Sequence, residues 1–185
     1  LLINASGYII TGLTALLTGI LATSKLFIDD DVFWHLATGR YISGSGFVIP
    51  SFDVFGFVTA GTYWIPFEWG WDLLTYYLYS AGDFLMLSVL RLVLVLIIFI
   101  VLYLTAKRAV MPISLFSLFS VILAFGMLVR FSVRPHLVSY AFLILLIFLL
   151  YSFYLYKQNI KVLYVLPFLF LLWANLHMGA VLGAG

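Results

Sequence analysis

The sequence predicts an all-α polytopic membrane protein with about five transmembrane helices and a large first exocytoplasmic loop that contains interfacial helices. Hydrophobic residues make up 65% of the chain and charged residues only 9%, whereas about a quarter of the residues of a soluble domain are charged. The apolar runs are continuous over about 20 residues, as in membrane-spanning helices, and do not alternate as in a β-barrel. Cysteine is absent, which excludes disulfides and thiolate chemistry.

The first predicted span covers roughly residues 3–27. It lacks the basic start and the small-residue cleavage site of a signal peptide, so we expect it to be retained. The chain begins with Leu and ends inside an apolar run, and we expect residues 1–185 to form a single transmembrane domain that is part of a longer protein. Close packing on other helices is expected from the small residues of this span, which are Gly7, Thr11, Gly12, Thr14, Thr18 and Gly19.

The least apolar region covers residues 29–80 and forms the predicted exocytoplasmic loop. Residues 31–43 have the pattern of a short helix that a Gly-Ser-Gly sequence ends. Residues 47–62 contain proline and glycine at intervals typical of a loop. Residues 63–80 are rich in Trp and Tyr, which favour the lipid headgroup region. The part after Pro66 is too short to cross a bilayer and is predicted to be an interfacial helix.

Further spans are predicted at about residues 84–105, 112–129 and 137–156, and a fifth begins near residue 162. Lys107, Arg108, Lys157 and Lys161 lie in two connectors that share one side if there are five spans. The positive-inside rule makes that side cytoplasmic. We therefore expect a cytoplasmic N-terminus, an exocytoplasmic 29–80 loop and a location in a bacterial inner membrane.

Three consecutive carboxylates follow the first span: Asp29, Asp30 and Asp31. Asp29 and Asp31 lie on the same side of an extended backbone, so both could bind one divalent cation such as Mg²⁺ or Mn²⁺. Alternatively, one of them acts as a general base, because clustered carboxylates raise one another's pKa. A helix N-cap explains one aspartate, but three exceed what a cap requires.

Other candidates lie further along the same loop. His35 is one helical turn after Asp31 and on the same face, where it binds substrate or metal, or packs as an ordinary interface residue. Arg40 suits a bidentate phosphate contact or a lipid headgroup. Glu68 is placed to face a sugar hydroxyl, with neighbouring tryptophans as stacking surfaces, or is solvated. A solvated position is the stronger expectation for Asp72.

The predicted spans and the connector RFSVRPH contain further polar groups. Arg91 lies inside the second span, where a charge is costly unless it faces protein or water. Asn175 and His177 form interhelical hydrogen bonds or line a cavity. Arg130 and Arg134 lie on the predicted exocytoplasmic side, contrary to the positive-inside rule. Either this is ordinary variation, or the two arginines bind an anion beside the aspartates.

Five short stretches together resemble the GT-C superfamily of integral-membrane glycosyltransferases, which use polyprenyl-phosphate-linked sugars. The acidic run after the first span occupies the position of the superfamily's acidic residues. The other four are the helix–Gly–Pro pattern from Arg40 to Pro50, the sequence PFEW at residues 66–69, RPH at 134–136 and WANLH at 173–177.

This resemblance implies an inverting sugar transfer at the outer membrane face. An aspartate of the loop, Asp29 or Asp31, would deprotonate the acceptor hydroxyl or bind a metal. Arginines would stabilise the departing lipid phosphate, and the acids and arginines would lie close without forming ion pairs, with the sugar between them. The residues expected to bind substrate are His35, Arg40, Glu68, Arg91, Arg130, Arg134, His136, Asn175 and His177.

The expected partners are the lipid bilayer and a lipid-linked sugar donor, without nucleic acid. Two other functions fit the same sequence. One is a non-catalytic integral-membrane subunit of a larger complex, with membrane proteins as partners. The other is a part of a transporter, with a path lined by Arg91, Asn175 and His177, although the second to fourth spans show little of the Gly and Pro pattern of broken helices.

Overall fold

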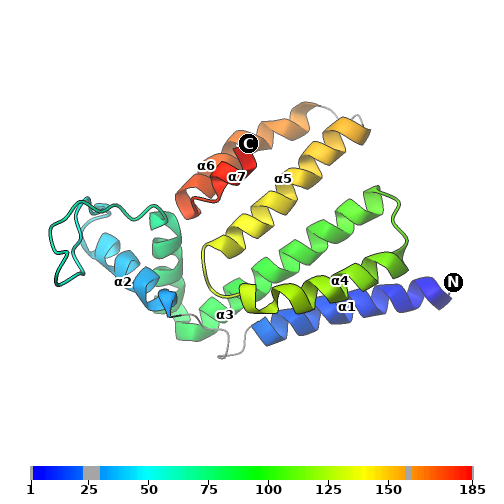
Figure 1. The fold of residues 1–185 in the computed structure, drawn as a ribbon, viewed down its shortest axis with the longest axis horizontal. Coiled ribbons are helices and arrows are strands. Elements are labelled where there is room, and N and C mark those ends of the chain that lie inside the picture. The colour runs from blue at the N-terminus through cyan, green and yellow to red at the C-terminus, as the bar shows by residue number, and fades with distance from the viewer. Residues whose placement is uncertain (1, 23–29, 157–159, 185) are drawn as a thin grey trace.

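The structure is a computed structural model that describes residues 2–22, 30–156 and 160–184. In these parts it is helical, apart from loops and one isolated antiparallel bridge between Phe52 and Tyr63. Figure 1 shows the arrangement of the helices. Their bounds are α1 Leu2–Ala22, α2 Asp31–Gly44, α3 Trp69–Arg108, α4 Ile113–Met127, the 3-10 helix η2 Leu128–Arg130, α5 His136–Tyr156, the 3-10 helix η3 Ile160–Val165, α6 Leu166–Leu176 and α7 Ala180–Ala184.

Two helices, α3 and α5, are long and apolar enough to cross a membrane. Shorter apolar helices cover residues 5–21, 113–127 and 160–176. The all-α class is therefore confirmed, and the chain is compatible with a bilayer. The count of five spans stays a prediction.

Helix α3 combines two elements that the sequence predicts separately, the interfacial helix and the second span. Its backbone leaves helical geometry at Gly82 (φ −175°, ψ 38°) and at Asp83 (φ 51°, ψ −149°). A positive φ is uncommon for a residue other than glycine, and such a break produces a sharp kink. The part before the kink therefore runs at an angle to the long apolar part, as Figure 1 shows.

Small residues of α1 allow close contact with α3 and α4, as the sequence predicts. A Cβ on Gly7 would lie 2.9 Å from the side chain of Ile113, and one on Gly19 would lie 2.3 Å from Leu92. The hydroxyls of Thr11 and Ser117 lie 3.1 Å apart. Figure 1 shows α1 and α4 side by side along their length.

The polar elements gather at one end of the helices. Helix α2, the first part of α3, the start of α5 and the end of α6 lie toward this end in Figure 1. The N-terminus and the connector between α3 and α4 lie at the opposite end, where Lys107 and Arg108 complete α3. This layout separates the predicted exocytoplasmic elements from a predicted cytoplasmic connector, and the side on which each lies stays a prediction.

An outer core cluster fixes α2 on α3 and α5. We use this name for the buried side chains Val32, Trp71, Leu87, Val133 and Val138. Val32 and Trp71 have no exposed surface. The α2 helix matches its prediction closely, and its buried face is the one that carries His35. The outer core cluster therefore positions the polar side chains described below.

The loop between α2 and α3 is organised by Asp53. One carboxylate oxygen, Oδ1, accepts hydrogen bonds from the backbone N–H groups of Phe55 and Gly56, each at 2.8 Å. The other, Oδ2, accepts one from the Thr59 hydroxyl at 2.5 Å. The Thr59 hydrogen bond first, and then the two backbone hydrogen bonds, lower the pKa of Asp53 below its ordinary value of 3.8.

Replacing Asp53 with alanine is expected to increase hydrogen exchange in residues 51–63 while leaving the helices unchanged. The folded loop favours the carboxylate form of Asp53 over the acid form. The contribution of Asp53 to the stability of the loop is therefore complete above its ordinary pKa, and it disappears as the pH falls through the lower pKa that Asp53 has in the folded loop. Hydrogen-exchange mass spectrometry at neutral pH tests this. Equal protection in the variant and the wild type would show that Asp53 does not order the loop.

Candidate active-site pocket

A pocket of about 260 Å³ lies between α2, the loop before α3, the start of α3 and the residue after His177. It is slightly smaller than sites for drug-sized ligands, which occupy about 300–1,000 Å³. Its lining combines aromatic, apolar and ionisable side chains. The lining residues are Trp34, His35, Trp64, Ile65, Pro66, Phe67, Glu68, Asp72 and Met178.

Two tryptophans form an aromatic wall of this pocket. The rings of Trp34 and Trp64 meet edge to face with their centroids 5.4 Å apart, and Phe55 contacts both rings. Trp34 remains 42% exposed. An exposed tryptophan ring beside polar groups is suited to a ligand with both an apolar face and hydroxyl groups.

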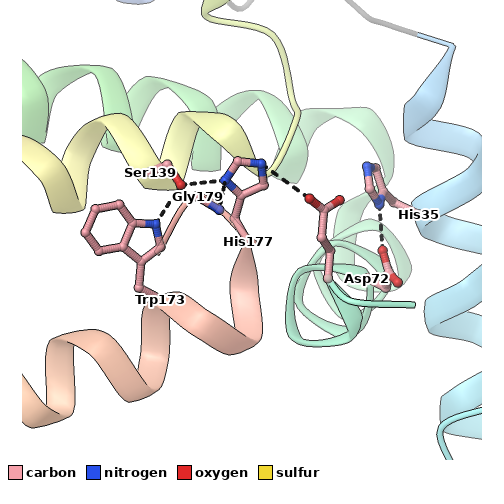
Figure 2. Close-up of polar contacts among 7 residues, drawn as sticks. His35, Asp72, Ser139, Trp173, His177 and Gly179 are labelled. Carbon is pink, nitrogen blue, oxygen red and sulfur yellow. Dashed lines mark hydrogen bonds and ion pairs between the residues drawn. The ribbon is translucent and has the colours of Figure 1, made fainter. Parts of the chain in front are cut away.

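His35 and Asp72 form a buried pair at the base of the pocket. The distance between His35 Nδ1 and Asp72 Oδ1 is 2.6 Å, and both residues are buried. Figure 2 shows the pair between α2 and α3. The solvated position expected for Asp72 is therefore wrong, because α2 covers this turn of α3. His35 of α2 thus pairs with Asp72 of α3.

Glu68 and His177 form a second pair, brought together from the start of α3 and the end of α6. Glu68 Oε1 lies 3.3 Å from His177 Nε2. Burial is the largest influence on Glu68 and raises the pKa of its carboxyl above the ordinary value of 4.5. His35 acts in the opposite direction, while the charges of Asp72 and Asp31 raise this pKa further.

On its other side, His177 joins a hydrogen-bond chain that Figure 2 displays. Its Nδ1 atom lies 2.5 Å from Ser139 Oγ and 3.1 Å from the backbone nitrogen of Gly179. The Trp173 indole N–H donates to Ser139 Oγ at 2.6 Å. Trp173 is fully buried, so this chain fixes the imidazole firmly against α5.

Asp31 and Arg134 meet at the rim of this region. Arg134 Nη2 lies 2.8 Å from Asp31 Oδ2, and their side chains are 36% and 55% exposed. The connector before α5 thus approaches the first turn of α2, as the hypothesis of an anion site requires. The expectation that acids and arginines avoid ion pairs is wrong for these two, because the connector before α5 brings Arg134 into contact with the first turn of α2.

The other predicted site residues do not line this pocket. Arg91 is fully buried on α3, while Arg40 and Arg130 are exposed. The His136 Nε2–H group donates to the Arg130 carbonyl at 2.7 Å. The Asn175 amide donates to the Leu171 carbonyl at 2.6 Å, and Asn175 lines a separate apolar pocket between α3, α5 and α6.

Asp29 lies outside the described residues, so its predicted catalytic and metal-binding roles stay predictions. In residues 30–156 and 160–184, no three His, Asp or Glu side chains converge in a way that would hold a metal ion. The carboxylate of Asp31, the other predicted ligand, is in contact with Arg134. The Mg²⁺ or Mn²⁺ site therefore remains an expectation from the sequence.

Ser139 and Gly179 take part in the site but were not predicted from the sequence. Ser139 follows His136 by three residues, and Gly179 follows His177 by two. The one signal in the sequence is their position, because this serine and this glycine each lie one helical turn or less after a histidine that is itself a candidate site residue. The close packing explains Gly179, because a Cβ there would lie 2.5 Å from both His177 Nδ1 and Ser139 Oγ.

Comparisons with protein-family models, with curated proteins and with solved structures find no match to this chain. The fold and the pocket therefore define only a class, a helical protein with two helices that could span a membrane and an acidic, tryptophan-walled pocket at one end.

Proposed function

We propose that this chain is a GT-C-like membrane glycosyltransferase, or the N-terminal part of one, which transfers a sugar from a polyprenyl-phosphate donor to an acceptor at the outer membrane face. One observation supports this function best. A pocket with two tryptophans and two carboxylates lies at one end of a group of apolar helices, and an arginine from a distant connector pairs with Asp31 of α2, a helix that lines this pocket. Asp31, the partner of Arg134, is close enough to influence the pKa of Glu68 in the pocket.

Each part of the donor has a counterpart in this arrangement. The sugar occupies the pocket against Trp34 and Trp64, where aromatic surfaces and a few polar groups are combined. The phosphate binds the guanidinium of Arg134, a group that matches phosphate geometry, and Asp31 orients that guanidinium. The polyprenyl chain lies along the apolar helices in the bilayer.

In the reaction, an acceptor oxygen attacks the anomeric carbon of the sugar. The new C–O bond forms as the bond from the anomeric carbon to the phosphate oxygen breaks, and this oxygen keeps both electrons. The leaving group is polyprenyl phosphate, and a carboxylate of the site receives the acceptor proton. Arg134 faces the negative charge that develops on the phosphate, which lowers the barrier if it is already in place.

Arg134→Gln is expected to reduce sugar transfer about 100-fold, since removal of one preorganised donor to a developing anion typically has an effect of that order. Arg130→Gln is the matched control, because it removes a nearby exposed arginine with the same change of charge. The assay measures release of polyprenyl phosphate from short-chain polyprenyl-phosphate sugars (hexoses, pentoses and amino sugars) by the full-length protein in proteoliposomes.

The two arginine variants distinguish a specific phosphate contact from general attraction of an anionic lipid. Equal losses in both would contradict the role assigned to Arg134. Asp31→Asn should also abolish transfer without loss of folding, as the sequence predicts for this aspartate. Wild-type protein that neither binds nor turns over any donor of the panel would overturn the proposed function.

A non-catalytic subunit of a larger membrane complex is the second candidate. The observation that favours it is that each carboxylate of the site has a polar partner: Asp31 with Arg134, Asp72 with His35, and Glu68 with His177. The pocket beside these pairs favours the enzyme. Binding of the lipid-linked donor to the purified chain, followed by intrinsic tryptophan fluorescence, separates the two candidates.

A further inference from the structure

The direction of each hydrogen bond from Trp173 to His177 can be assigned. An indole N–H only donates, so Ser139 Oγ accepts the Trp173 hydrogen bond. The hydroxyl hydrogen of Ser139 is then available for His177 Nδ1, which lies 2.5 Å away. We call the series Trp173, Ser139, His177 and Glu68 the Glu68 relay.

A second donor fixes the protonation of His177. The backbone N–H of Gly179 also points to Nδ1, at 3.1 Å, and a backbone N–H cannot accept a hydrogen bond. An Nδ1–H group would face the Gly179 N–H, which can only donate, so Nδ1 carries the lone pair and the proton of the neutral ring resides on Nε2. Nε2, which carries this proton, lies 3.3 Å from Glu68 Oε1, so the protonated ring nitrogen of neutral His177 is the one next to the carboxylate.

Of the three carboxylates of the site, Glu68 is the one best placed to receive a proton from a ligand. Asp31 is in direct contact with Arg134 at 2.8 Å. Asp72 has a side chain that is only 3% exposed and lies 2.6 Å from His35. Glu68 lines the pocket, has a side chain that is 25% exposed and has the longest of the three contacts.

We propose that Glu68 is the general base of the transfer, and that His177, held in its Nε2–H form by Ser139 and Gly179, is the residue that positions it. This inference rests on the proposed sugar transfer. As the acceptor oxygen bonds to the anomeric carbon and the phosphate oxygen departs with the electrons of the broken bond, the acceptor proton moves to the free carboxylate oxygen of Glu68. A neutral histidine beside the carboxylate limits its movement and leaves its charge in place.

The surroundings of Glu68 suit a general base. Burial keeps its pKa above the ordinary carboxyl value, which brings a carboxylate closer to the pH at which it accepts protons well. The ionisable groups around it are His35 and Asp31 of α2, Asp72 of α3, and His177, with His136 of α5 close to His177. Because the base must be ionised, transfer should decline as the pH falls through the raised pKa of Glu68.

The tautomer of His177 can be measured without any enzymatic assay. The chain has three histidines, so ¹⁵N-histidine labelling of the whole protein in nanodiscs gives few signals, and a His177→Gln variant assigns the relevant ones. The Nε2–H tautomer is expected for His177 in the wild type. A mixture of tautomers is expected in Gly179→Ala, whose new Cβ would lie 2.5 Å from both Nδ1 and Ser139 Oγ. Ser139→Ala keeps the Gly179 donor, so a smaller population of the other tautomer is expected there. An Nδ1–H signal in the wild type would overturn the relay.

Kinetics then test the base. Glu68→Gln should reduce kcat by about 10²- to 10⁴-fold, the usual contribution of a general base, and Glu68→Asp should restore part of the rate. Ser139→Ala should lower kcat about tenfold with little change in KM, because the loss of one ordinary hydrogen bond corresponds to about that factor. Ser120→Ala, at a buried serine of α4 away from the pocket, should leave the rate unchanged.

The outcomes separate the two proposals. If the wild type transfers sugar and Glu68→Gln does so at a similar rate, the inference about Glu68 fails while the glycosyltransferase stands. If the wild type has no donor binding or turnover but the ¹⁵N spectra show the Nε2–H tautomer, the relay is a structural device and the proposed function fails. A wild-type rate that does not fall at acid pH, together with an active Glu68→Gln variant, would also exclude Glu68 as the base.

Discussion

Replacing Gly39 with alanine is expected to detach α2 from α3 and to disrupt the pocket between them. A Cβ at this position would lie 2.1 Å from the backbone oxygen of Asp72 and 2.6 Å from the Cβ of Tyr76. Neither atom is the end of a flexible side chain, so the helices must separate. Such overpacking typically lowers the free energy of unfolding by about 1–3 kcal/mol or more, and here the separation also breaks the His35–Asp72 pair.

Gly44→Ala is the matched control, because Gly44 is on the same helix and a Cβ there would meet nothing within 4 Å. Alanine is the better helix former by about 1 kcal/mol, so Gly44→Ala should be neutral or slightly stabilising. Thermal unfolding in detergent and donor binding measure the two variants side by side. A Gly39→Ala protein with wild-type stability and binding would show that α2 does not approach α3 this closely.

Local sequence signals predicted the helices well. The helix expected at residues 31–43 corresponds to α2, Asp31–Gly44, because its start and its Gly-Ser-Gly end are encoded within a few residues. The predicted boundary between the interfacial helix and the second span, at residues 80–84, coincides with the kink of α3 at Gly82 and Asp83, where the backbone leaves helical geometry. The change of hydropathy at this point marks the break in the sequence.

The pairing of the site residues could not be predicted in the same way. Glu68 and His177 were both candidates, yet 109 positions separate them, and only the packing of α6 against the start of α3 brings them together. Gly70 permits this approach, since a Cβ there would lie 2.7 Å from the Asn175 carbonyl oxygen. Helical periodicity reports which residues share a face, but it carries no information about which faces meet.

The run of three aspartates is conspicuous in the sequence, whereas Asp72 stands alone in a helix. In the fold, Asp72 becomes the more buried group because α2 covers it, and Asp31 remains mostly exposed beside Arg134. The environment that tunes a carboxyl group is therefore a tertiary property. A count of acidic residues along the chain cannot supply it.

The second large effect is expected at Trp71, which lies at the centre of the outer core cluster with no exposed surface. Trp71→Ala removes the side chain that α2, α3, the connector before α5 and α5 itself share. Truncation of a buried tryptophan typically lowers the free energy of unfolding by about 3–5 kcal/mol. Because the cluster holds α2 in place, the variant should lose the pocket as well as stability, and denaturant unfolding in detergent together with donor binding should show both losses.

Trp71→Phe separates the role of the aromatic volume from that of the indole nitrogen. Within the described residues, Trp71 Nε1 is buried without a hydrogen-bond partner, and such a group destabilises the fold by about 1–3 kcal/mol relative to a satisfied one. Phenylalanine removes the N–H group and keeps an aromatic ring. The cost of the small cavity and the gain from losing the unsatisfied polar atom should offset each other, so the free energy of unfolding of Trp71→Phe should be close to that of the wild type. If Trp71→Phe is instead as unstable as Trp71→Ala, the indole nitrogen has a partner that matters, and the outer core cluster depends on a polar contact as well as on packing.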